Sequence, residues 1–103
     1  MVPTHAVRPN ASESWTVSGD ASAGLSYHTE GRNWLNAVIA SGHSATAAVR
    51  MLVDGQEVAR VTLRAGQAWS PSLAAPHPLP PGAVIAFTSD EIAYVSAFGF
   101  RAP

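Results

Sequence analysis

Apolar and polar residues alternate most clearly between residues 45 and 63, and this pattern predicts two antiparallel strands joined at Asp54-Gly55. We expect a three-residue loop, Val53-Asp54-Gly55, with Gly55 in the left-handed region. A two-residue turn would pair Val49 with Arg60 and leave both faces of the hairpin mixed. With the three-residue loop, the core side carries Ala45, Val49, Met51, Ala59, Val61 and Leu63, and the other side carries Thr46, Arg50, Arg60, Thr62 and Arg64.

Short apolar runs on either side of this hairpin predict further strands near residues 15–18, 25–28, 33–41, 68–73, 83–88 and 92–101. Residues 74–82 are rich in proline, and we expect them to form an extended loop without helix or sheet. In the last strand the large residues Ile92, Tyr94, Phe98 and Phe100 alternate with small apolar ones. Both faces of this strand are therefore apolar. Either it lies between two covered faces, or its outer face meets another subunit.

These strands predict an all-β fold, a small antiparallel β-sandwich or jelly-roll-like barrel of about seven or eight short strands. The chain shows no internal repeat, no domain boundary and no convincing amphipathic helix. We expect residues 14–103 to form one β-sandwich domain. Residues 1–13, with prolines at positions 3 and 9, are expected to form an extended N-terminal arm.

Composition narrows the possible partners of the chain. It has 103 residues, 13% of them charged, with a formal net charge of −1 and no cysteine. This charge gives no electrostatic reason to expect nucleic acid or a membrane as partner. The absence of cysteine excludes disulfides and thiolate metal sites.

The amino terminus lacks the apolar region of a signal peptide, so we expect synthesis in the cytoplasm. Such a low charged content has two interpretations. Part of the protein surface is covered by a partner, or small and polar side chains are enough to keep the protein soluble.

Catalytic chemistry finds little support in the sequence. The histidines at positions 5, 28, 43 and 77 show no metal-ligand spacing, and no nucleophile motif or phosphate-binding glycine loop is present. We therefore expect a protein that is not an enzyme, with no catalytic residue, cofactor or metal. A hydrolase would require at least two members of one set to converge in a single pocket: His28, His43, His77, Asp54 and Asp90.

Aromatic residues suggest a binding alternative. Tyr27, Arg32, Trp34 and Trp69 have the side chains that stack on a sugar ring and bind its hydroxyl groups, so they are the candidates for a glycan- or receptor-binding module. The other interpretation is that the tryptophans fill the open ends of a small sandwich, because large rings dominate core packing.

The run Val-Arg-Met-Leu-Val-Asp-Gly-Gln-Glu-Val-Ala-Arg-Val-Thr-Leu-Arg-Ala-Gly-Gln, followed by Leu-Pro-Pro-Gly-Ala-Val-Ile-Ala-Phe, resembles small β-sandwich modules of bacteriophage virions, over about residues 46–88. Such modules occur in head decoration (cement) proteins and in tail-fibre or tail-tip domains. The resemblance implies a structural virion protein that binds capsid or tail subunits by packing, as a homo-oligomer, with a trimer favoured. A cytoplasmic location is the alternative.

Candidate contacts with such partners come from the arm, the arginine-bearing hairpin face and the proline-rich segment. Extended segments can add main-chain hydrogen bonds to a sheet edge, and arginine suits interfaces because its guanidinium is weakly hydrated. The candidate partner-binding residues are Arg8, Arg50, Arg60, Arg64, Pro76, His77 and Pro78.

Overall fold

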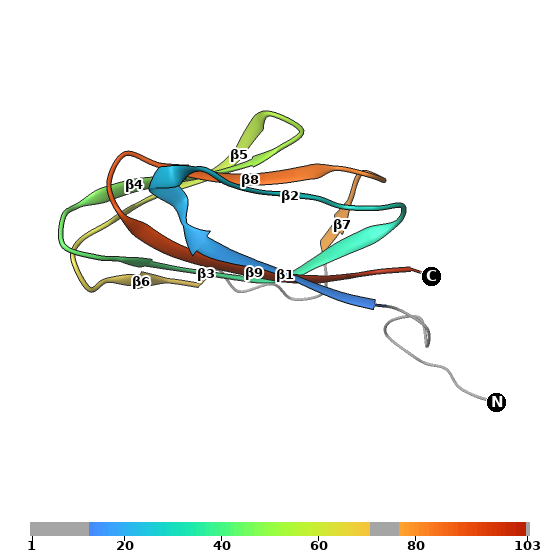
Figure 1. Cartoon of the computed structure of the whole chain (residues 1–103), viewed down its shortest axis with the longest axis horizontal. Coiled ribbons are helices and arrows are strands. Elements are labelled where there is room, and N and C mark those ends of the chain that lie inside the picture. The colour runs from blue at the N-terminus through green and yellow to red at the C-terminus, as the bar shows by residue number, and fades with distance from the viewer. Residues whose placement is uncertain (1–12, 71–76, 103) are drawn as a thin grey trace.

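The computed structural model describes residues 13–70 and 77–102, and it confirms the predicted β-sandwich (Figure 1). The described part of the chain contains nine strands and one 3-10 turn. In chain order they are β1 (Glu13–Asp20), η1 (Ala21–Ala23), β2 (Leu25–His28), β3 (Asn33–Gly42), β4 (Ala47–Val53), β5 (Gln56–Leu63), β6 (Ala68–Trp69), β7 (His77–Leu79), β8 (Val84–Ser89) and β9 (Ala93–Arg101).

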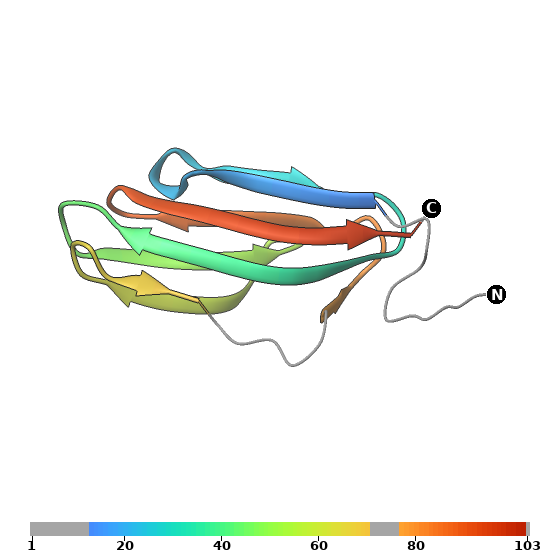
Figure 2. The same cartoon turned by 90° about the horizontal axis from the view of Figure 1, so that it is seen from below.

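The strands form two antiparallel sheets. The five-stranded sheet has the order β1-β9-β3-β6, with β7 pairing to the same strand, β3, as β6 does. The four-stranded sheet has the order β2-β8-β4-β5. Figure 2 shows β1, β9 and β3 side by side across the five-stranded sheet. The inward side chains of both sheets form the core, led by Trp15, Leu35, Val38, Val49, Leu63, Ile85, Phe87 and Val95.

The β4–β5 hairpin has the predicted faces, but the predicted loop length is wrong. The turn has two residues, Asp54 and Gly55, both with positive φ (51° and 82°), as in the type I′ turn that suits the twist of paired strands. The pairing then shifts by one residue between Met51 and Leu52, so that Val58 is the extra residue of a β-bulge. The bulge restores the apolar pairs that a plain two-residue turn would lose: Ala47 with Leu63, Val49 with Val61, and Met51 with Ala59.

The small residues of β9 face the core. Ala93, Val95, Ala97 and Gly99 are all buried. Gly99 pairs with Trp15 on one side and with Leu35 on the other, and the Trp15 ring lies where a side chain of residue 99 would be. The larger residues of β9 consequently point outward.

Three further expectations differ from the structure. The proline-rich segment, predicted to lack sheet, contains strand β7, and Pro78 lies in it opposite Trp34. Among the described strands β7 is at a sheet edge, where the missing N–H of proline removes no ladder hydrogen bond. The strand predicted over residues 68–73 is present as β6, which ends at Trp69; residues 71–73 of that prediction lie outside the described residues. Strand β1 begins at Glu13, the last residue of the predicted arm; the rest of the arm lies outside the described residues.

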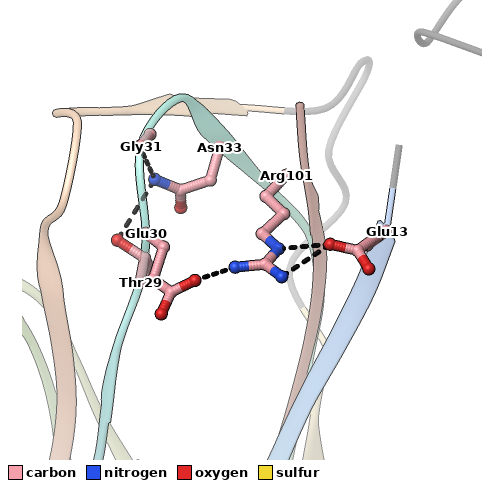
Figure 3. Close-up of polar contacts among 6 residues, drawn as sticks. All are labelled: Glu13, Thr29, Glu30, Gly31, Asn33 and Arg101. Atoms are coloured by element: carbon pink, nitrogen blue, oxygen red, sulfur yellow. Dashed lines mark hydrogen bonds and ion pairs between the residues drawn. The ribbon is translucent and has the colours of Figure 1, made fainter. Parts of the chain in front are cut away.

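Polar contacts fix the loop between β2 and β3 at one end of the sandwich (Figure 3). The buried Thr29 hydroxyl donates to the carbonyl of Ala83 at 2.5 Å, and the Asn33 amide donates to Thr29 Oγ1 at 3.1 Å and to the carbonyl of Gly31 at 3.0 Å. Beside this network, Arg101 is ion-paired with Glu13 and with Glu30. The contacts tie β1, β9 and the β2–β3 loop together.

Candidate functional site

The outer face of the five-stranded sheet carries large apolar side chains. Tyr94 and Phe98 of β9 point away from the core, with 49% and 37% of their surface exposed. Ile39 of the adjacent strand β3 is 46% exposed. Trp34 and Phe100 are cross-strand partners that stack with ring centroids 5.1 Å apart, and Phe100 is buried beneath its neighbours. We call these five residues the aromatic face.

Charge lies only at the margin of the aromatic face, where the guanidinium carbon of Arg32 is 5.4 Å from the centroid of the Trp34 ring. Residues at the outward positions of β1, β9 and β3 are otherwise small or polar, and Asp20 at the end of β1 is the one charged residue among these described positions. The Asp20 carboxylate accepts hydrogen bonds from the backbone and hydroxyl of Ser22, which lower its pKa. An exposed apolar patch depleted of charge is typical of the centre of a protein interface.

The outer face of the four-stranded sheet differs in that it carries charges. Arg50 and Arg60 are cross-strand partners, and both donate to the Glu57 carboxylate, from Arg50 Nε at 2.7 Å and from Arg60 Nη2 at 2.8 Å. The hydrogen bonds from Arg60 and then from Arg50 lower the pKa of Glu57 to about 2. The two predicted partner-binding arginines therefore lie together and are neutralised in part by this carboxylate. Arg64 follows β5 and is exposed.

A cleft opens between the edges of the two sheets, where β4 and β5 face β3, β6 and β7. Its volume is about 510 Å³. The bulge at Val58 bends the hairpin, and Figure 1 shows its tip rising away from the five-stranded sheet. We call this cavity the edge cleft. It is lined by Leu35, Val38, Met51, Val53, Asp54, Gln56, Val58, Ala59, Trp69, His77, Pro78, Leu79 and Pro80.

The described residues of the predicted partner-binding set are thus divided among three places, one of which is the position of Arg64 after the end of β5. Arg50 and Arg60 lie on the outer face of the four-stranded sheet, whereas His77 and Pro78 line the edge cleft. Arg8 and Pro76 lie outside the described residues.

The residues of the predicted ligand-binding set are also separated. Tyr27 stacks on Trp15 with centroids 5.1 Å apart and packs against the core, and Trp69 lines the edge cleft. Only Arg32 and Trp34 come together, with the guanidinium carbon 5.4 Å from the centroid of the Trp34 ring. A sugar needs a free aromatic face, but Trp34 is already flanked by Phe100 and Arg32.

Two members of the predicted hydrolase set, Asp54 and His77, do line the same cleft. The Asp54 carboxylate accepts a hydrogen bond from the backbone N–H of Val84 at 2.9 Å and so ties the β4–β5 turn to β8. The described lining offers no hydroxyl, thiol or amine as a nucleophile. Within residues 13–70 and 77–102, no three histidine or acidic side chains are grouped so as to hold a metal ion.

Sequence reasoning did not identify Ile39, Tyr94 and Phe98 as a surface. The sequence feature that could have indicated this surface is the pattern of residues 92–101. Both faces of that strand are apolar, so one of them either lies outside the core or is covered by another subunit. The edge cleft had no comparable signal, because its walls come from five strands.

Comparison with protein-family models, curated proteins and solved structures finds no match to this chain. In the part of the chain that the structure describes, no helix has the length and apolar character needed to cross a membrane.

Proposed function

We propose that this chain is a non-enzymatic structural protein of a bacteriophage particle, on the capsid or tail, which assembles by packing its aromatic face against a second copy. The observation that carries the packing mode is the exposed aromatic face, in which Ile39, Tyr94 and Phe98 are large apolar side chains in contact with water. The phage setting is supported by the resemblance of residues 46–88 to virion sandwich modules.

A second copy fits this face for an electrostatic reason. Two identical surfaces bring identical charges together, and like charges across an interface oppose association. The aromatic face has no charge at its centre, so it can meet itself. The face bearing Arg50, Arg60 and Glu57 has a net positive cluster that would lie against the same cluster of the second copy. Flat sheet faces also pack well on one another, about 10 Å apart.

The size of the face sets the strength that we expect. Strand spacing near 4.8 Å and a rise near 3.3 Å per residue give β1, β9 and β3 a face of roughly 400 Å². That is about half of the roughly 800 Å² that each partner buries in a standard interface. We therefore expect weak pairing in solution, strengthened on a particle where several contacts act together.

The order of the oligomer follows from the same geometry. A face that meets its own copy produces a two-fold dimer. The trimer favoured from the sequence would require the aromatic face to meet a different surface of its neighbour.

Sedimentation velocity over a range of concentrations tests the packing. We expect the wild-type chain to move from monomer to dimer at micromolar to millimolar concentration. Phe98→Ser should remove the dimer, because it replaces the central exposed ring of the face. Val84→Ser is the matched control: Val84 is 36% exposed on the outer face of the other sheet, and its replacement should leave the dimer intact. A wild-type chain that stays monomeric, or equal loss in both variants, contradicts the packing.

The phage assignment has a separate test. Peptide mass spectrometry of purified particles from the source culture should find the chain in a fixed ratio to the major capsid or tail protein. Its absence from such particles contradicts the virion role and leaves the packing unaffected.

The glycan-binding alternative receives no support from the placement of its residues. Tyr27, Trp34 and Trp69 lie in three different parts of the sandwich. The receptor-binding alternative would use the aromatic face as its contact surface, the same surface that is proposed here to meet a second copy.

A further inference from the structure

We propose that the edge cleft is a binding site for a small organic cation with an apolar body. This site is separate from the aromatic face, and it does not depend on the proposed assembly or on a phage origin.

The volume and walls of the cleft suit a small molecule. At about 510 Å³ it falls within the range of roughly 300–1,000 Å³ that is usual for ligand sites. Leu35 and Val38 are buried side chains of β3, and Met51 and Val53 of β4 are partly buried opposite them. An apolar body gains free energy by covering such walls, since it removes apolar surface from water.

The walls are held by the packed sheets. Val38 is 1% exposed and pairs in register with Ala97 of β9, so it belongs to the core and to the cleft at once. Across the cleft, Val53 pairs with Ile85 of β8. A ligand can therefore enter a site that is already formed, which lowers the ordering cost of binding.

One carboxylate gives the cleft its charge preference. Asp54 is the only acidic side chain in the described lining, and no arginine lines it. The Asp54 carboxylate is held in place by its hydrogen bond from Val84 N and by the tight turn in which it lies. A cationic group on the ligand is attracted to this carboxylate, whereas an anionic group is repelled by it.

Trp69 adds a second reason to favour a cation. Its ring packs against the core while lining the cleft. The face of an indole ring attracts cations, and Trp is the most effective side chain in this respect. Gln56 and His77 supply further polar atoms for orientation.

Displacement of the neutral fluorescent probe N-phenyl-1-naphthylamine from the full chain tests the site. Titrations are made at pH 8. Dodecylamine and dodecanoate, used below their micellar concentrations, share a twelve-carbon chain and differ in the charge of the head group. We expect wild-type protein to bind the probe and dodecylamine to displace it at about tenfold lower concentration than dodecanoate.

Matched variants test whether the preference for dodecylamine over dodecanoate comes from the Asp54 carboxylate. Asp54→Asn keeps an oxygen for Val84 N and tolerates positive φ, and it should bring the tenfold preference close to one. Asp90→Asn is the control, because Asp90 also accepts a backbone hydrogen bond, from Ala48 N at 2.8 Å, but lies outside the cleft. Val58→Lys should weaken probe binding, and Val84→Lys should not. Thermal melts confirm that each variant is folded.

Three results would overturn the proposal: no binding of the probe by wild-type protein, equal displacement by the two amphiphiles, or an equal change of preference in Asp54→Asn and Asp90→Asn. Each of them leaves the aromatic face and its dimer untouched.

Discussion

The two outer faces of the sandwich carry different side chains on similar backbones. On the four-stranded sheet, Arg50 and Arg60 face solvent around Glu57. On the five-stranded sheet, comparable positions hold Tyr94 and Phe98. We call the surface that carries Arg50, Arg60 and Glu57 the charged face. Its charged side chains pair with one another, whereas the aromatic face leaves apolar surface in water. The difference teaches that, in a chain with few charges, the face to examine for a partner is the one that leaves large apolar side chains exposed.

The largest expected effect on stability comes from Gly99, whose contact with Trp15 places the small residues of β9 on the core side and Tyr94 and Phe98 on the outside. A Cβ on Gly99 would overlap the Trp15 ring and the carbonyl oxygen of Trp34. We expect Gly99→Ala to lower the free energy of unfolding by about 3 kcal/mol, since both neighbours are held in the packed sheet. Urea unfolding measures it. Ser96→Ala, on the outward side of the same strand, should change stability by less than about 0.5 kcal/mol. Equal effects would show that Trp15 does not lie against Gly99.

A smaller effect is expected at the tip of the charged hairpin. Gly55 has φ of 82°, and a Cβ there would meet nothing within 4 Å. Gly55→Ala therefore tests backbone strain alone, and we expect a loss of about 1 kcal/mol in the free energy of unfolding. Thermal or urea unfolding measures the loss. An unchanged midpoint would argue against positive φ at this turn.

The smallest effect should come from the ion pairs of the charged face. The pKa of Glu57 is lowered from 4.5 to about 2 by Arg60 and Arg50, so its ionised form is favoured in the folded chain. Its contribution to stability is therefore complete above pH 4.5 and is lost as pH falls toward 2.

The measurement is the difference in urea midpoint between wild-type and Glu57→Gln protein from pH 7 to pH 2. We expect a small difference at pH 7 that shrinks across this acid range, because exposed ion pairs contribute little. A difference that does not vary with pH would mean that the Glu57 charge plays no part.

The local alternation of apolar and polar residues was sufficient to predict most of the strands and the two faces of the β4–β5 hairpin. It could not give the hairpin loop length, because a three-residue loop and a two-residue turn with a bulge place Val49 and Val61 on the same side. Strand β7 was missed because proline residues hide an edge strand whose pairing depends on β3.

The candidate sites depended on long-range packing. The sequence showed that both faces of β9 are apolar, but only the contact of Gly99 with Trp15, far away in the chain, decides which face is outside. The edge cleft likewise exists only once β3, β4 and β6 are assembled, with Val38, Met51 and Trp69 in its walls.

In the proposed packing, the aromatic face, and not the charged face, is covered in the assembled state. Hydroxyl-radical footprinting of the wild-type chain, read by mass spectrometry at dilute and high concentration, tests it directly. We expect labelling of Tyr94 and Phe98 to fall severalfold as the dimer forms, while labelling of Val84 on the other sheet stays constant. Protection of Val84 with Tyr94 and Phe98 still labelled, at a concentration where the chain is associated, would contradict the account.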